Sequence, residues 1–123
     1  MTGDALMQRA LRLLNYTDPR GEIDRTQTAE LWRRGLTLID LLLADVLPIE
    51  GKEIQTLDAL TDELPVSGHT AAAVLPYGLA MLLAQSEGDG DNQQLMAAMY
   101  NQKRGSIRHP AERVADVLPV PTD

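Results

Sequence analysis

The sequence of 123 residues contains no cysteine and no phenylalanine, and only 3% of its residues are aromatic. The absence of cysteine excludes disulfides and thiolate metal sites. With so few aromatic side chains, the core has to be built from Leu, Ala, Val, Ile and Met. Such a core favours helices, because Leu, Ala and Met lose little side-chain freedom there. Hydrophobic residues make up 44% and charged residues 24%, which is typical of one globular domain.

No segment has the pattern of a signal peptide or of a membrane span. The N-terminal stretch MTGDALMQRALRLL carries Arg9 and Arg12 within its apolar part. The most hydrophobic run, LTLIDLLLADVLP, is interrupted by Asp40 and Asp45 and is too short to cross a bilayer. We therefore expect a soluble protein that is made in the cytoplasm and has no contact with a membrane.

Apolar spacing predicts an all-α fold, a small bundle of about four principal helices, and no alternating run predicts a strand. The expected helices span residues 4–15, 28–48, 70–87 and 92–104, and a short helix at 56–63 interrupts an acidic, irregular crossover. Residues 1–105 form the helical domain in this interpretation, and residues 106–123 form an extended C-terminal tail.

Several local features refine these expected helices. Asp4 is the predicted N-cap of the first helix, and Thr26 or Thr28 that of the second. The second helix is apolar on two sides, which is typical of the middle of a bundle or the seam of an oligomer. Gly35 indicates that a neighbouring element approaches it closely. Pro76 requires that the third helix is kinked there or begins later, near Leu75.

The fourth helix is expected to place Leu95, Met96, Met99 and Tyr100 on one face. The acidic turn before it, SEGDGDNQ, resembles a calcium loop only superficially. Counted from Glu87, the sixth position is Asn92 and the twelfth is Ala98, so the glycine and the closing glutamate of an EF-hand are both missing. We interpret it as a helix–helix turn, in which Gly88 takes a left-handed conformation and Asp91 caps the fourth helix with the help of Gln94.

The sequence gives no catalytic constellation. His69 and His109 are the only histidines, and neither HExxH nor GxSxG occurs. We interpret Ser67-Gly68-His69 as the entry to the third helix rather than as a nucleophile with its base. Asp40 and Asp45 are five residues apart, so they do not share a helical face and are expected at the surface or at an oligomer interface. The prediction is a protein that is not an enzyme and has no cofactor or metal.

Charge is unevenly distributed along the chain, whose net charge is −7. Residues 40–91 carry ten acids against Lys52 alone, and residues 103–113 carry four basic side chains against Glu112. The overall acidity argues against a dedicated binder of duplex DNA. The candidate contacts to partners or to other copies are Trp32, Arg33, Arg34, Lys103, Arg104, Arg108 and Arg113. Trp32 belongs either to the core or to an interface as an anchor beside its arginine pair.

The order of several segments resembles a known family. These segments are ALRLLNY, a Leu-rich helix, the linker LDALTDELPV, the run YGLAMLLAQSEGDGDNQQLMAAMYNQKR, and RVADVLPV near the end. Together they are similar to the small helical head–tail connector and DNA-packaging proteins encoded between the portal and tail genes of tailed phages and prophages.

The resemblance implies a structural protein of the virion, present in the host bacterial cytoplasm during assembly. It would form a homo-oligomeric ring beneath the portal protein and bind the neck or tail proteins. It would be a monomer in isolation and would make at most non-specific contact with packaged DNA. Such a ring requires two different patches on each subunit, for which the acidic middle and the basic C-terminal segment are candidates. There are three alternatives: a helical regulatory adaptor that docks through Trp32, a small metal- or nucleotide-dependent enzyme, and a terminase-type DNA-binding accessory protein.

Overall fold

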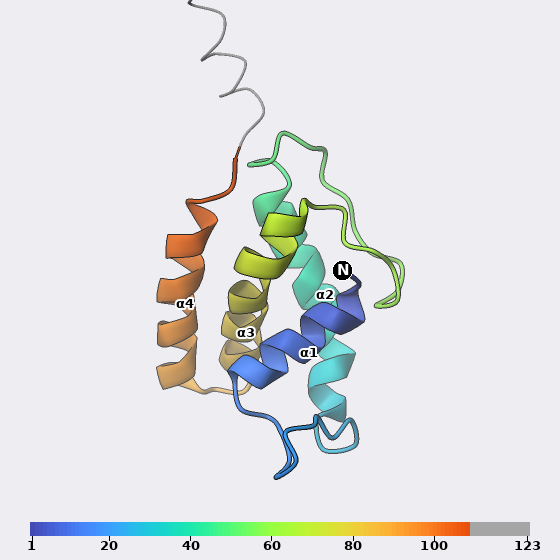
Figure 1. Ribbon diagram of the computed structural model, residues 1–123, viewed down its shortest axis with the longest axis vertical. Coiled ribbons are helices and arrows are strands. Elements are labelled where there is room, and N and C mark those ends of the chain that lie inside the picture. The colour runs from blue at the N-terminus through green and yellow to red at the C-terminus, as the bar shows by residue number, and fades with distance from the viewer. Residues whose placement is uncertain (109–123) are drawn as a thin grey trace, which may run out of the picture.

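The computed structural model describes residues 1–108 as a helical bundle (Figure 1). Its helices are α1 (Gly3–Leu13), α2 (Ala29–Val46), α3 (Leu75–Ser86) and α4 (Gly90–Arg104), and a single π-helical turn, η1 (Thr70–Val74), leads into α3. The described residues contain no strand, only an isolated bridge between Thr2 and Glu63. The all-α prediction is therefore confirmed. None of the helices in residues 1–108 is both long and apolar enough to cross a membrane.

Helix α3 is the central element of the bundle. It contacts α1, α2 and α4, which lie around it (Figure 1). Its buried residues point in almost every direction: Leu75, Pro76, Gly78, Leu79, Ala80, Leu83 and Ala84. Helix α2, in contrast, leaves Leu41 58% exposed on its outer side. The middle of the bundle is thus occupied by α3 rather than by α2.

Two glycines allow the helices to approach one another closely. A Cβ atom on Gly35 would lie 2.7 Å from the sulfur of Met7, so α1 packs directly on the backbone of α2. This confirms the close approach that was predicted at Gly35. A Cβ atom on Gly78 would lie 2.7 Å from both Leu42 and Tyr100, which places α3 against α2 and α4 at one level.

The entry into α3 shows how the chain accommodates Pro76. The α-helical part begins at Leu75, which places Pro76 in its first turn. The chain is already helical before Leu75, however, so the irregularity predicted at Pro76 is a distortion of a continuous helical path and not a later start. The preceding residues Thr70–Val74 continue the helix as a π turn.

The beginning of α1 differs from its prediction. Thr2, not Asp4, is the N-cap, and its hydroxyl oxygen accepts the N–H of Ala5 at 3.2 Å. The reason is tertiary, because the crossover supplies acceptors for the first N–H groups of the helix. The N–H of Gly3 donates to the carbonyl of Asp62, and that of Asp4 donates to the carbonyl of Leu60.

The predicted short helix at 56–63 is wrong, since this stretch contains only turns and irregular backbone. Carboxylates accept three N–H groups of this stretch and hold its irregular backbone. Asp62 accepts from the N–H groups of Asp58 and Ala59, and Asp40 of α2 accepts from that of Leu57. Side-chain acceptors of this kind compete with helix formation.

The turn between α3 and α4 follows the prediction in part. Gly88 has φ +71°, which confirms its left-handed conformation. The cap of α4 is Asp89, however, whose carboxylate accepts the N–H of Asn92, and Asp91 lies within the first turn. The prediction of Asp91 as the cap was therefore wrong by two residues. Met96 and Tyr100 are buried as expected, but Leu95 is 56% exposed and lies outside the apolar face.

The described chain stays attached to the bundle just beyond α4. Ile107 is buried, and the hydroxyl of Ser106 lies 2.7 Å from Nε2 of His69. Contacts therefore continue past Gly105, where the domain boundary was predicted. The rest of the predicted tail, residues 109–123, lies outside the described residues.

Candidate interaction surface

Two of the predicted contact arginines bind acids that lie far along their own chain. Arg34 on α2 is 2.7 Å from Glu87 at the end of α3 and also donates to the hydroxyl of Ser86. Arg104 on α4 makes two hydrogen bonds to Asp45 on α2, at 2.7 and 3.0 Å. The acidic middle of the sequence and its basic C-terminal segment therefore meet within one subunit.

Asp45, Tyr100 and Arg104 form a small polar cluster at the junction of α2 and α4. The hydroxyl of Tyr100 donates to Asp45 at 2.6 Å. Hydrogen bonds from Arg104 hold the pKa of Asp45 below its ordinary value against the opposing effect of burial. Burial and the neighbouring Asp45 raise the pKa of Tyr100, which therefore stays protonated as a donor. The cluster orients α4 on α2, and all its members are engaged with one another.

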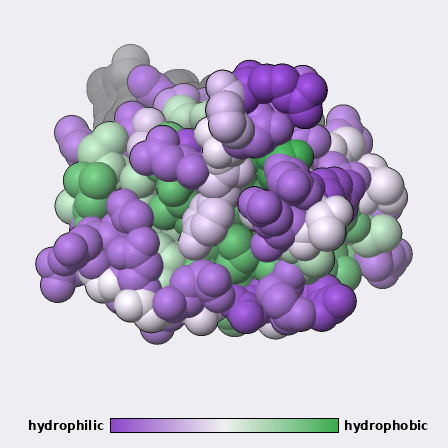
Figure 2. Space-filling model, turned by 90° about the horizontal axis from the view of Figure 1, so that it is seen from below, coloured by the Kyte–Doolittle hydropathy of each residue, from purple (hydrophilic) through white to green (hydrophobic). Residues whose placement is uncertain are grey.

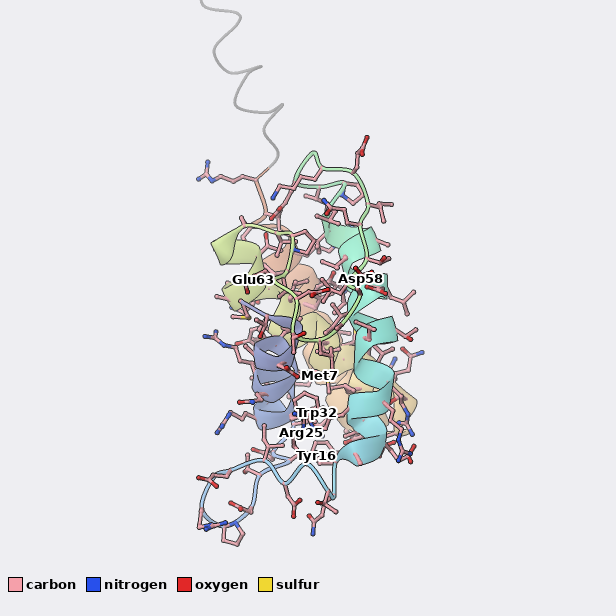
Figure 3. All side chains as sticks on the ribbon, turned by 90° about the vertical axis from the view of Figure 1, so that its right-hand side faces the viewer. Met7, Tyr16, Arg25, Trp32, Asp58 and Glu63 are labelled. Carbon is pink, nitrogen blue, oxygen red and sulfur yellow. The ribbon has the colours of Figure 1, made fainter. Side chains whose placement is uncertain are left out.

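Trp32 lies inside the molecule at the start of α2. It is only 7% exposed, and its indole N–H donates to the hydroxyl of Thr28 at 3.1 Å. The guanidinium of Arg25 lies over a Trp32 ring, 3.7 Å from its centre, and Figure 3 labels the two residues close together. Of the two interpretations of Trp32, the structure supports the core residue. Trp32 is therefore not exposed as the anchor that the alternative, an adaptor docking through this residue, would need.

The remaining predicted contacts are more accessible. Arg33 is exposed and paired with Glu30 one turn earlier on α2. The ammonium of Lys103 lies 5.0 Å from the ring centre of Tyr77. Arg108 is exposed at the end of the described chain, and Arg113 lies outside the described residues.

A buried carboxylate escaped the sequence analysis. Glu50, which is 5% exposed, accepts hydrogen bonds from the backbone N–H and hydroxyl of Ser67 and from the hydroxyl of Thr70, and pairs with Lys52. Burial on its own would raise the pKa of Glu50, but hydrogen bonds from Thr70, Lys52 and Ser67 lower it below the ordinary value. Glu50 thereby fixes the entry to η1.

This arrangement also bears on the Ser67-Gly68-His69 triplet. The hydroxyl of Ser67 donates to Glu50 at 2.9 Å, whereas His69 contacts Ser106. The two side chains thus have different partners, and the structure supports their interpretation as the helix entry. No position in the sequence marked Glu50 as the partner, because the two contacts join residues that are 17 and 20 positions apart.

The acidic turn lies at the lower end of the bundle. Figure 2 shows this end, on which hydrophilic side chains predominate and hydrophobic patches are small. In the described part of the chain, no three His, Asp or Glu side chains are grouped closely enough to hold a metal ion. Glu87 pairs with Arg34, and Asp89 caps α4, so each has a structural partner.

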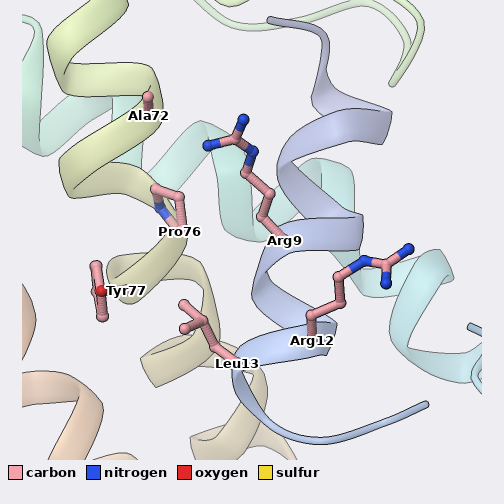
Figure 4. A pocket seen from close by; sticks show the side chains of 6 residues that line it. All are labelled: Arg9, Arg12, Leu13, Ala72, Pro76 and Tyr77. Carbon is pink, nitrogen blue, oxygen red and sulfur yellow. The ribbon is translucent and has the colours of Figure 1, made fainter. Parts of the chain in front are cut away.

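A groove between α1 and the η1–α3 segment combines apolar and cationic groups (Figure 4). It has a volume of about 390 Å³ and is lined by Arg9, Arg12, Leu13, Ala72, Pro76 and Tyr77. Arg12 donates to the carbonyl of Gly21 at 2.8 Å, and Figure 4 shows its guanidinium turned away from α3. The guanidinium of Arg9 instead reaches over the gap between the two helices and, within residues 1–108, forms no ion pair.

The chain was compared with protein-family models, curated proteins and solved structures. No family model, no curated protein and no solved structure matches it. The candidate surface consists of the groove with Arg9, which the geometry identifies, and of the exposed side chains of Arg33 and Arg108, which the sequence had indicated. The groove residues come from α1, η1 and α3, and no spacing in the sequence indicated that they meet.

Proposed function

We propose that the protein is a structural subunit of the head–tail connector of a tailed phage or prophage. In this role it forms a ring beneath the portal protein, extends the channel for DNA and binds the next neck or tail protein. It acts through assembly and not through catalysis.

The main support for the proposal is that the segments that resemble the connector family lie next to one another in the structure. Tyr77-Gly78-Leu79-Ala80 lies on α3, the acidic turn follows, and Tyr100 with the basic residues lies on α4. Gly78 admits the ring of Tyr100, and Lys103 lies over the ring of Tyr77. These residues form one α3–α4 hairpin. Segments that follow one another in the sequence therefore also pack together, as a fold shared with the connector family would require.

The distribution of contacts also supports a building block. Internal ion pairs such as Arg104–Asp45 and Arg34–Glu87 join the helices to one another, while Leu41 and Leu95 are large exposed hydrophobic residues on different helices, α2 and α4. A subunit that meets two neighbours in a ring uses two different surfaces.

The test is made in the genome that carries the gene. Deleting the gene is expected to give DNA-filled heads that lack tails, and supplying the full chain from a plasmid is expected to restore tailed particles. Electron microscopy counts the particles, and mass spectrometry of purified virions looks for the protein. Normal numbers of tailed particles after deletion, or a protein missing from virions, would overturn the proposal.

A further inference from the structure

We propose that the groove between α1 and α3 binds residues 114–120 of a second copy of this chain. The inference rests on the proposed function, because it names the contact through which one ring subunit holds the next. It is carried by the chemistry of the groove and by the composition of the chain that follows residue 108.

The groove combines an apolar surface with a cationic edge. Leu13, Ala72 and Pro76 supply the apolar part, and the ring of Tyr77 is half-buried beside them. Arg9 and Arg12 stand at the α1 edge, and the guanidinium of Arg9 reaches toward α3. Aromatic and proline side chains in a shallow groove bind extended, proline-containing segments well, because such segments lose little conformational freedom on binding.

Residues 114–120, VADVLPV, have the complementary composition. The segment contains five apolar side chains, one proline and one acid, Asp116, and no basic residue follows it in the sequence. Its apolar residues suit Leu13 and Pro76, and Asp116 is the counterion for Arg9, which lacks a carboxylate partner among residues 1–108. An opposite charge at such a site chiefly sets the register and the rate of association.

The source of the segment follows from the end of the described chain together with the proposed ring. Buried Ile107 and the contact of Ser106 with His69 hold the chain at the end of the bundle where α4 ends. The groove runs from Ala72 in η1 down to Leu13 at the C-terminal end of α1 (Figure 4). Since His69 is three residues from Ala72, the described chain ends near the Ala72 end of the groove, and the proposed ring, in which neighbouring subunits contact one another, makes the neighbour's segment the occupant. Segment and groove are also two different patches, as a ring requires.

The lack of native cysteine makes a direct test possible. One full-length variant carries Ala72→Cys in the groove, and a second variant of different tagged size carries Val117→Cys. After mixing and mild oxidation, a disulfide-linked heterodimer is expected on a non-reducing gel. The matched control replaces Ala72→Cys by Thr37→Cys, an exposed position on α2 that does not line the groove. Heterodimers that form equally fast with Thr37→Cys, or no heterodimer with Ala72→Cys, would overturn the inference.

A charge reversal tests the role of Arg9. Arg9→Glu in the groove variant is expected to slow heterodimer formation by about fivefold, the scale of a partly exposed ion pair, and Asp116→Arg in the partner is expected to restore the rate. Arg20→Glu is the matched control, because it changes the net charge equally at an exposed position that does not line the groove. An equal effect of both reversals would overturn the assignment of Arg9.

A chain carrying both Ala72→Cys and Val117→Cys distinguishes the source of the segment. If it forms an internal disulfide while the mixture of single variants gives no heterodimer, the segment binds its own subunit and the inference fails. These outcomes are separate from the virion test. A protein present in virions without the cross-link would overturn this contact alone, and a cross-link in a protein missing from virions would overturn the connector function alone.

Discussion

Helix α3 and the crossover of residues 47–69 belong to the same bundle but are held in place by different interactions. Helix α3 is fixed by apolar packing on almost every side, with Leu79 and Leu83 fully buried. The crossover has few buried side chains, and carboxylates hold its backbone, as Glu50 does at Ser67 and Asp40 does at Leu57. Many of the acids in this part of the sequence are therefore internal acceptors. The difference shows that a block of like charge can serve the fold and need not indicate a docking surface.

The largest effect is expected from a change in α3. Leu79→Ala removes most of a fully buried side chain at the centre of the bundle and is expected to lower the free energy of unfolding by about 3 kcal/mol. Urea denaturation followed by circular dichroism measures this value. The control is Leu95→Ala on the exposed side of α4, with an expected change within about 0.5 kcal/mol. Similar losses for both variants would show that α3 is not the centre.

Next in size is the removal of the buried acceptor of the crossover. Glu50→Ala leaves the N–H of Ser67 and the hydroxyl of Thr70 without their partner and is expected to cost about 2 kcal/mol. Glu53→Ala, an exposed acid three residues away, is the matched control with an expected change within about 0.5 kcal/mol. If both substitutions had the same small effect, the crossover would not depend on Glu50.

Acidification is expected to weaken the crossover by less than Glu50→Ala does, since protonation leaves the side chain in place. The pKa of Glu50 and that of Asp45 are lower in the folded protein than their ordinary values of 4.5 and 3.8. The unfolded chain therefore takes up protons first as pH falls. Stability is complete above these ordinary values and declines as pH falls through them toward the lower folded-state pKa values. Unfolding free energies measured from pH 6 downward test this, and Glu50→Gln should reduce the slope.

The smallest effects concern the turn that joins α3 to α4. Asp89→Ala is expected to cost about 1 kcal/mol through loss of the helix cap, and Asp91→Ala only about 0.5 kcal/mol through loss of a first-turn carboxylate. Thermal unfolding of the two variants side by side compares them. A larger loss of stability for Asp91→Ala would show that Asp91, the cap predicted from the sequence, caps the helix.

The helices could be predicted because their apolar spacing is a local property. Trp32, Ile39 and Leu43 mark the inner side of α2, and a close approach at Gly35 follows from the cost of glycine in a helix. What failed depended on partners far along the chain. The N-terminus of α1 takes acceptors from Leu60 and Asp62, and no window around Asp4 contains them.

The interaction surface was less predictable than the fold for the same reason. Charge along the sequence indicated Arg34 and Arg104, yet both are occupied by Glu87 and Asp45, residues more than 50 positions away. Arg9 drew attention only as an interruption of an apolar stretch. Its place beside Pro76 and Tyr77 depends on how α1 crosses α3, which is a result of packing and not of local pattern.

The enclosed position of Trp32 has a practical consequence for spectroscopy. As the only tryptophan of the chain, it is the main source of indole emission, and it lies at the end of the bundle where α2 begins. Its emission therefore reports on the solvent access of that end, while the far-ultraviolet dichroism averages over all helices. Coincidence of the two signals during unfolding means that this end and the rest of the bundle separate in one cooperative step.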